Sequence, residues 1–511
     1  MSSSFRVLGC LALWLVATAA WRPLLVPDEG RYASIAFHML VGDPLVPMLN
    51  GLPFFHKPPL LYWIDMAAFS VLGVNPFAAR MGPALGAFVL GASLYFHLRH
   101  WHGLRVAVAG VVIVATTPFV WVGGQYVNHD MGVAGCITAA VLAAVRALEV
   151  TGRQRYGWWV QAWMFCGLGV LAKGLIGVVL PGLIVLPWLM AQRRWSDLWW
   201  FLHPLGWLVL ATVVGPWLWA MHMRFPEFID YFIVEQHFRR YGGTTFNNQQ
   251  PAWFFVAVLP LLTLPWSLWI VSATRTAWRR RLDRFQERWD APAEPQAQPI
   301  TSTPLLGLYL WWIVVIIGFF SVPRSKLVGY VLPAAAPWCA LLACGLAHRA
   351  RIWQRVGVVS ALLCVAIVAG LAWHAPHSAR SVALELKRLM QPGDRVLFVN
   401  EYFYDVPFYA QLQQPVWVLS DWDDPQIKLR DNWRKELHDA RRFATAQQQA
   451  VLWPVAQAHA LVCEGSSTSW VVAHSGWQRD GTAVPHGQQV FEAVGVQLWR
   501  ILPSDCRGAS R

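Results

Sequence analysis

Residues 26–32 read Val-Pro-Asp-Glu-Gly-Arg-Tyr, and residues 54–59 read Phe-Phe-His-Lys-Pro-Pro. Both stretches lie in one segment between the first two long apolar runs of the chain. Ionisable side chains at membrane depth are costly unless they are paired or lie in a wet cavity, so they are functional candidates. The segment therefore indicates a reaction site at a membrane surface.

The composition on either side of this segment is that of a polytopic membrane protein. The 511 residues are 56% hydrophobic and only 14% charged, with a mean hydropathy of +0.39, which lies outside the range of soluble globular chains. We expect a mainly α-helical bundle with about 11 spans. The windows long and apolar enough to cross a bilayer are 6–22, 77–98, 105–122, 130–148, 157–172, 174–191, 204–222, 252–272, 304–321, 327–346 and 353–373.

The arginines predict how these spans are oriented, because short cytoplasmic loops retain Lys and Arg. With the N-terminus inside, basic residues recur in every second loop, for example Arg99 and Arg105. This places loops 23–76 and 223–251 and the tail from residue 374 on the opposite side, which is the periplasm in a bacterial inner membrane. The net charge of +13 then reflects topology and contact with anionic lipids. No nucleic-acid motif accompanies it.

The N-terminal segment has two readings. Residues 1–21 resemble a cleaved signal peptide, with Arg6 followed by an apolar run and Ala17-Thr-Ala19. The apolar character continues through residues 24–26, which favours a retained anchor. Cleavage would leave the later orientation unchanged.

The chain changes character beyond the spans, so we predict two domains: a membrane domain over 1–373, with loops 23–76 and 223–251, and a periplasmic α/β domain over 374–511. Short β-rich runs occur at 395–400, 416–420 and 470–474, with helix-like stretches at 380–391 and 430–450. The Pro- and Gln-rich end of 274–303 predicts a flexible cytoplasmic linker. Cys463 and Cys506 are candidates for an exported disulfide, whereas the other six cysteines lie in spans.

The predicted topology collects ionisable residues at one face of the membrane and so suggests a shared cavity. The alternative for each residue is that it pairs to hold a loop against the bundle. The sequence has no Walker pattern and no Gly-x-Gly-x-x-Gly after a strand, which are the patterns of nucleotide-phosphate sites. The energy for a reaction must therefore arrive in the substrate. The residues are Asp28, Glu29, Arg31, His56, Lys57, Asp130, Lys173, Glu235, His237, Arg239, Arg240, Arg324 and Lys326.

Several of these side chains have both a structural and a chemical interpretation. Asp28 and Glu29 follow Pro27, as expected at a helix N-terminus where the helix dipole favours negative charge, yet a carboxylate there can also accept a proton. Lys57 precedes two prolines and is either a phosphate contact or a headgroup anchor. His56 and His237 are a weak candidate pair for a divalent metal such as zinc.

Several short motifs occur in order along the chain: Asp-Glu-Gly-Arg-Tyr (28–32), Lys57-Pro58, Asn128-His129-Asp130, Leu-Ala-Lys-Gly (171–174), Glu235-Gln-His237, and Ser325-Lys-Leu with Tyr330 and Pro333. Taken together, these motifs resemble the aminoarabinose transferases of lipid A and, more broadly, the GT-C membrane glycosyltransferases that include the protein O-mannosyltransferases. The resemblance runs over roughly residues 20–350. One position departs from it, because the Glu-Lys-Pro of the aminoarabinose enzymes reads His56-Lys57-Pro58 here.

This resemblance implies an inverting glycosyltransferase that takes its sugar from a polyprenyl-phosphate donor, needs no cofactor and modifies lipid A or a related envelope glycan. Asp28, Lys57 and Asp130 are the expected catalytic residues. Lys57 would stabilise the departing phosphate, and Asp28 would act as general base for a hydroxyl acceptor or, if the acceptor is a lipid A phosphate, would orient the sugar. The expected substrate-binding residues are Glu29, Arg31, Tyr32, His56, Lys173, Arg239, Arg240, Lys326 and Tyr330.

Two other functions fit the same sequence features. A protein O-glycosyltransferase would use the same donor chemistry on exported Ser or Thr residues. A lipid or solute transporter would also contain many spans and buried charges, but transporters usually have repeated halves and ionisable groups near the midplane. Here the charges collect at one face and no internal repeat is found, which favours an enzyme.

Overall fold

The computed structural model describes residues 3–239, 248–289, 303–374, 378–463, 467–477, 484–485 and 487–508. Their contacts divide the chain into two compact units. The helical unit comprises the described residues within 1–21, 80–239 and 248–370. The mixed unit comprises those within 22–79 and 371–508. The charged segment quoted above thus groups with the C-terminal part of the chain, which differs from the division at residue 373 expected from sequence.

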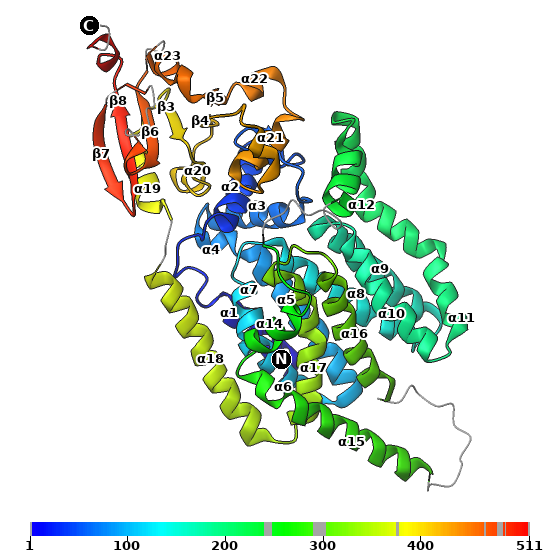
Figure 1. Ribbon diagram of the computed structural model, residues 1–511. Coiled ribbons are helices and arrows are strands. Elements are labelled where there is room, and N and C mark those ends of the chain that lie inside the picture. Colours follow the sequence, from blue (N-terminus) through cyan, green and yellow to red (C-terminus); the bar gives the residue numbers. More distant parts are fainter. Residues whose placement is uncertain are drawn as a thin grey trace. The chain divides into compact units, whose positions relative to one another are not determined.

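The described elements of the helical unit are all helices, apart from one isolated β-bridge between Gln249 and Ser325 (Figure 1). Up to residue 224 these are α1 (Ser3–Val16), α5 (Met81–His102), α6 (Leu104–Thr116), α7 (Pro118–Gly123), α8 (His129–Ala147), α9 (Gly152–Lys173), α10 (Ile176–Ala191), α11 (Trp195–Leu198), η1 (Trp199–Leu202) and α12 (Pro204–Arg224). After it come η2 (Asp230–Arg239), α14 (Phe254–Leu262), η3 (Trp266–Trp269), α15 (Ile270–Trp289), α16 (Thr303–Ser321), η4 (Val328–Ala334), α17 (Ala335–Leu346) and α18 (Ala350–Trp373).

Each of the eleven apolar windows contains a helix. Five described helices are long and apolar enough to cross a membrane, or six if one bent pair forms a single span, and shorter apolar helices accompany them. The mainly helical architecture is therefore confirmed. The number of helices that cross the bilayer stays a prediction.

Helix α8 is deeply enclosed within the helical unit. Almost all of its side chains are buried, and it packs against α5 and α9. Many of the buried residues are Ala or Gly, and such small side chains let helix backbones approach closely within a membrane. The N-terminus of α8, where Asp130 lies, is consequently held by its neighbours.

Two local expectations about this unit are wrong. The window 252–272 is not one continuous span, because α14 and the helix that starts at Trp266 meet at 104°; Pro265 at the break has no N–H to continue the ladder of helical hydrogen bonds. The linker expected over 274–303 is helical up to Trp289, since its Arg, Leu, Gln and Glu residues are good helix formers. Residues 290–302 lie outside the described part.

The mixed unit begins with the first loop and continues after α18. The first loop supplies α2 (Asp28–Val41), β1 (Met48–Leu49), β2 (Leu52–Pro53), α3 (Leu60–Leu72) and α4 (Pro76–Ala79). The C-terminal part supplies α19 (Arg380–Leu389), β3 (Arg395–Val399), α20 (Val406–Ala410), β4 (Trp417–Ser420), η5 (Pro425–Leu429), α21 (Trp433–Arg441), α22 (Ala446–Gln449), β5 (Leu452–Pro454), η6 (Val455–Gln457), α23 (Ala458–Cys463), β6 (Ser469–His474), β7 (Gln488–Ala493), β8 (Val496–Ile501) and η8 (Asp505–Gly508).

A six-stranded sheet organises this part of the chain in the order β5-β4-β3-β6-β8-β7 (Figure 1). The first four strands are parallel, and β8 and β7 are antiparallel to their neighbours. Strands β3, β4 and β6 are the three runs expected from sequence, and their apolar residues are buried because the sheet is covered on both faces. The strand order reverses at β3, since β4 lies on one side of it and β6 on the other.

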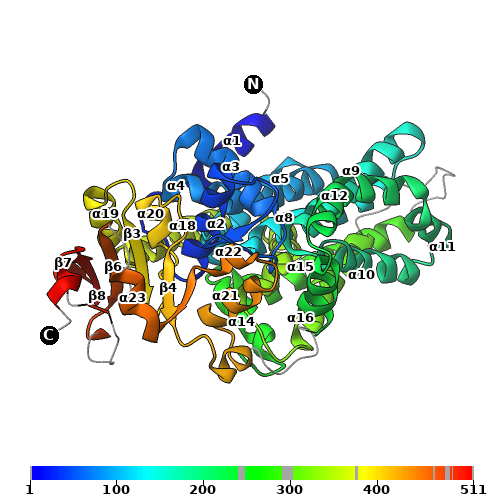
Figure 2. The same ribbon diagram turned by 90° about the horizontal axis from the view of Figure 1, so that it is seen from above.

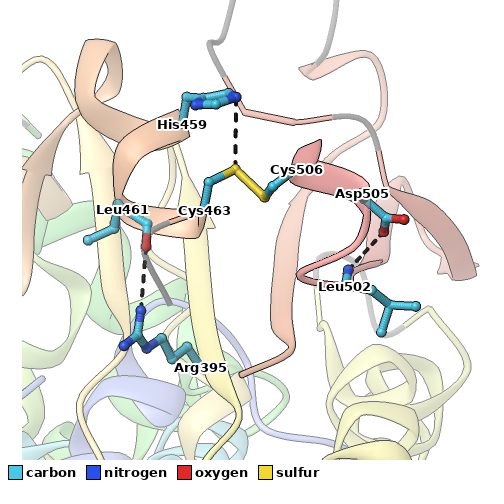
Figure 3. Close-up of a disulfide and its surroundings, with 7 residues drawn as sticks. All are labelled: Arg395, His459, Leu461, Cys463, Leu502, Asp505 and Cys506. Atoms are coloured by element: carbon cyan, nitrogen blue, oxygen red, sulfur yellow. Dashed lines mark hydrogen bonds between the residues drawn. A yellow bond between two sulfur atoms is a disulfide. The ribbon is translucent and has the colours of Figure 1, made fainter. Parts of the chain in front are cut away.

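The two candidate cysteines of the C-terminal part are joined. Cys463 at the end of α23 and Cys506 in η8 form a disulfide with their Cα atoms 5.5 Å apart (Figure 3), within the usual range for this bond. The other six cysteines form no disulfide. The bond connects the end of the chain, after β8, to the helix that precedes β6.

Candidate functional site

The Asp-Glu-Gly-Arg-Tyr motif forms the first turns of α2. The helix begins at Asp28 directly after Pro27, with both acids in its first turn, where they interact favourably with the helix dipole. The helix N-terminus expected from sequence is thus confirmed. The two neighbouring carboxylates have different surroundings.

Glu29 is fully buried and holds the loop that precedes its helix. Its carboxylate pairs with Arg22 and accepts the backbone N–H of Leu25 at 2.8 Å. A buried carboxylate needs such partners to offset the loss of its hydration. These contacts favour a structural role for Glu29, whose place among the substrate-binding residues stays a prediction.

Asp28 remains partly accessible, with 30% of its side chain exposed. Its Oδ1 accepts a hydrogen bond at 2.6 Å from the Nη2 of Arg31, one helical turn along α2. The Nη1 of Arg31 is bonded to Glu436 on α21. One guanidinium therefore connects the accessible carboxylate to a buried carboxylate 405 residues further along the chain.

Two tyrosines contact the buried end of this network. The Tyr404 hydroxyl donates to Oε2 of Glu436 at 2.5 Å, and the Arg31 guanidinium lies over the rings of Tyr404 and Tyr32 at 5.1 and 5.2 Å. Burial raises the pKa of the Glu436 carboxyl, and Arg31 and the Tyr404 hydroxyl oppose that shift. Tyr32 thus contributes a ring face to Arg31.

The second motif of the loop leads into α3. His56 stacks on Phe54 at 4.5 Å, and its Nε2 lies 4.0 Å from Oδ2 of Asp439 on α21. Lys57 is half-buried in the turn before Pro58-Pro59, which restrict the backbone ahead of the helix. These residues share the mixed unit with Asp28.

The helical unit contains a second charged group at the ends of three elements. Asp130 lies in the first turn of α8, where Asn128 caps the helix by accepting the Asp130 N–H at 3.1 Å. Its carboxylate pairs with Lys173, the last residue of α9. Lys173 Nζ also lies 4.5 Å from the ring centroid of Tyr330 in η4. Three predicted residues are thereby brought together.

Gly329 makes room for this group. A Cβ added there would lie 2.2 Å from Oδ2 of Asp130, closer than any side chain tolerates. Lys326, three residues earlier, is buried and donates from Nζ to the carbonyl oxygens of Gln250 and Pro323 at 2.9 and 2.5 Å. Its ammonium group therefore ties two loops of the helical unit together.

For three of the predicted residues the structure describes no side chain. Arg240 lies outside the described residues, as do the side chains of His237 and Arg239, whose backbone belongs to η2. The side chains that the structure describes contain no group of three or more His, Cys, Asp or Glu residues able to hold a metal. The metal at His56 and His237 stays a prediction, as does the single cavity shared by all thirteen ionisable residues.

Sequence reasoning did not find Glu436 or Tyr404, although both contact Arg31. Glu436 lies on an amphipathic helix rich in charged residues, where a glutamate normally faces solvent. No short motif marks either residue. Only the pairing of the first loop with a distant domain could have identified them.

Comparison with known proteins gives a consistent result. The family "Dolichyl-phosphate-mannose-protein mannosyltransferase" matches residues 15–232. An undecaprenyl phosphate-alpha-4-amino-4-deoxy-L-arabinose arabinosyl transferase from Pectobacterium carotovorum subsp. carotovorum is 30% identical over 413 residues, which cover 78% of this chain and 68% of the relative. The protein with the same description from Pseudomonas aeruginosa (strain LESB58) is 31% identical over 366 residues, which cover 68% of this chain and 61% of that protein's length.

The fold is also similar to a solved structure. The crystal structure of ArnT from Cupriavidus metallidurans bound to undecaprenyl phosphate superposes with a TM-score of 0.79 at 20% identity and covers 98% of each chain. At this identity the likeness establishes the fold alone. It extends over the helical and the sheet-containing parts of the chain.

Proposed function

The chain belongs to the family of undecaprenyl phosphate-aminoarabinose arabinosyl transferases, and from this membership we propose that it transfers aminoarabinose from undecaprenyl phosphate to lipid A. The transfer would take place at the periplasmic face of a bacterial inner membrane. A membrane-linked donor agrees with the lack of a nucleotide-phosphate motif in the sequence. One observation carries the proposal: α2 presents an accessible carboxylate, Asp28, fixed by Arg31.

During the transfer, negative charge develops on the phosphate of the departing undecaprenyl group. An acceptor oxygen attacks the anomeric carbon of the sugar, and the bond to undecaprenyl phosphate breaks with its electron pair going to the phosphate. A cation placed near that phosphate stabilises the transition state more than the ground state. We assign this role to Lys57, with Lys326, Arg239 and Arg240 as further cations of the predicted face.

Asp28 acts on the sugar or the acceptor. With a hydroxyl acceptor it takes the proton as general base. With a lipid A phosphate no base is needed, and Asp28 instead pairs with the amine of the sugar. Asp130, held by Lys173, would share the task of orienting the sugar. A single displacement inverts the anomeric centre, so NMR assignment of the donor and product linkages should give opposite configurations.

A reconstituted assay tests the proposal directly. Purified protein in proteoliposomes is given undecaprenyl phosphate-aminoarabinose and lipid A, and the product is followed by mass spectrometry. We expect lipid A to gain one aminoarabinose, Asp28→Asn to reduce turnover by about 100-fold or more, and Lys57→Ala to weaken turnover more than Lys57→Arg. Lipid A of unchanged mass in the presence of active donor would contradict the proposal.

The match to protein mannosyltransferases favours one alternative, transfer of a sugar to exported proteins. Mass spectrometry of periplasmic proteins from cells with and without the gene distinguishes the two. Glycosylated Ser or Thr residues together with unmodified lipid A would support the alternative. Increased resistance to polymyxin with modified lipid A would support the proposal.

A further inference from the structure

The candidate catalytic helix α2 packs at a particular edge of the C-terminal sheet. The Ser34 hydroxyl of α2 donates to the carbonyl of Tyr404 at 2.8 Å, and a Cβ added at Gly30 would lie 2.9 Å from the Asp405 nitrogen. Residues 400–405 follow β3 directly. Helix α2 is thus seated on the segment that leaves the carboxyl end of β3.

That edge is where open α/β sheets place functional groups. In such sheets the connections from two strands diverge where the strand order reverses, and the crevice beyond their carboxyl ends binds ligands. Here β3 has β4 on one side and β6 on the other. In the mixed unit a helix with a candidate catalytic carboxylate contacts the chain at this position.

The hydrogen bonds of Arg31 fix how α2 is oriented on this segment. Arg31 uses one nitrogen for Asp28 and the other for Glu436, so the guanidinium plane is fixed by two carboxylates. Glu436 is in turn fixed by the Tyr404 hydroxyl, which belongs to the same segment after β3. Figures 1 and 2 both show α21, which carries Glu436, beside α2.

Other contacts hold the same loop without reaching Asp28. The backbone N–H of Leu24 donates to the Tyr409 hydroxyl at 2.7 Å, and the Asn50 side chain bonds both the N–H and the carbonyl of Val416 at 2.8 and 2.9 Å. These ties fix the loop on the domain. Arg31 is the residue through which Glu436 is connected to the Asp28 carboxylate.

We propose that Glu436 is a positioning residue for the transfer reaction, which sets the orientation of the Asp28 carboxylate through Arg31. The C-terminal domain would then contribute directly to the geometry of the candidate active site. The inference rests on the proposed function, because it takes the role of Asp28 from there.

A double-mutant cycle separates positioning from a general effect on folding. Glu436→Gln keeps the shape of the side chain and its ability to accept from Tyr404, but removes the charge that Arg31 requires. We expect kcat to fall about tenfold with the donor KM within twofold, and the same substitution to change turnover less than twofold in an Asp28→Asn protein. If Asp28→Asn has no measurable turnover, Arg31→Lys serves as the second background.

Tyr409→Phe is the matched control, since it removes one buried tie of the same loop. We expect it to lower turnover by the same factor in both backgrounds, because loss of folded protein is independent of Asp28. Equal factors for Glu436→Gln in the two backgrounds would overturn the inference.

Hydrogen exchange gives a readout that does not depend on activity. The backbone amides of residues 28–34 should exchange faster in Glu436→Gln than in Tyr409→Phe. Each protein is measured at a temperature the same number of degrees below its own Tm. Unchanged exchange in Glu436→Gln would also overturn the inference. A wild-type protein that transfers no sugar would defeat the proposed function instead, and the exchange data would then show only whether Glu436 holds the start of α2 in place.

Discussion

The two charged groups that contain the candidate site residues are built in different ways. In the helical unit, Asp130, Lys173 and Tyr330 come from the ends of elements that pack within one bundle. In the mixed unit, Asp28 and Arg31 depend on Glu436, which lies more than four hundred residues away in the sequence. The first group is a property of a helix bundle, whereas the second exists only when a loop and a distant domain are folded together.

The largest loss of turnover and stability is expected when a buried ion pair of the helical unit is broken. Lys173→Met leaves the Asp130 carboxylate buried without its cation, which typically costs about 3–5 kcal/mol. We expect turnover below one hundredth of wild type and a lower Tm, measured in proteoliposomes and by thermal scanning. The double variant Asp130→Asn/Lys173→Met should recover Tm but not turnover. Full turnover in the double variant would show that this pair is only structural.

Loss of the disulfide should affect the mixed unit alone. The bond closes a loop between residues 43 positions apart, for which chain entropy predicts about 4 kcal/mol of stabilisation. Cys463→Ser/Cys506→Ser should therefore increase hydrogen exchange in β6 and β8 while leaving α8 and α9 unchanged. Cys10→Ser, which alters a free and exposed cysteine of α1, is the control. Equal loosening of both units would contradict their separate stability.

The mixed unit should also respond to pH through Asp405. Burial raises the pKa of this carboxyl from 3.8 to about 6, although Ser378 and the Ala379 N–H donate to it. Because the folded protein holds this proton more tightly than the unfolded chain, the stabilisation is full below pH 3.8 and is lost as pH rises through about 6. The shift corresponds to about 3 kcal/mol.

Asp405→Asn tests this dependence. The amide oxygen still accepts both hydrogen bonds, so the unfolding free energy of the mixed unit at pH 7 should rise by up to about 3 kcal/mol. Its change between pH 4 and pH 7 should become smaller. The exposed Asp421→Asn is the control, and an unaltered pH dependence in Asp405→Asn would refute the expectation.

The smallest effect is expected when a methyl group is added at either of two glycines that lie close to other atoms of the protein. Gly329→Ala forces a Cβ against the Asp130 carboxylate, and Gly30→Ala forces one against the backbone of Asp405; such overpacking costs about 1–3 kcal/mol. We expect both to reduce turnover about tenfold. Gly318→Ala on α16, where a Cβ meets open space, should have no effect. Wild-type turnover in either variant would show that the atoms facing that glycine are free to move.

The same contrast explains what the sequence could predict. Helix positions, the buried strands β3, β4 and β6, and the helix start at Asp28 follow from local patterns of apolar and charged residues. The pairing of Asp130 with Lys173 was within reach, since both residues had been singled out as charges at the ends of spans. Glu436 was not, because its local surroundings are those of a solvated helix and its partner is set by tertiary packing. The helical start of the 274–303 segment was missed because the proline-rich end dominated its composition.

The grouping of residues 22–79 with the C-terminal sheet has a consequence for biosynthesis. The ribosome completes the loop that carries Asp28 roughly three hundred residues before it begins the sheet with which that loop groups. A nascent chain that ends between residues 374 and 435 would retain every apolar helix and every motif of the first loop. It would lack Glu436 to engage Arg31, so only a chain extended beyond residue 436 could hold the Asp28 carboxylate in the orientation proposed above.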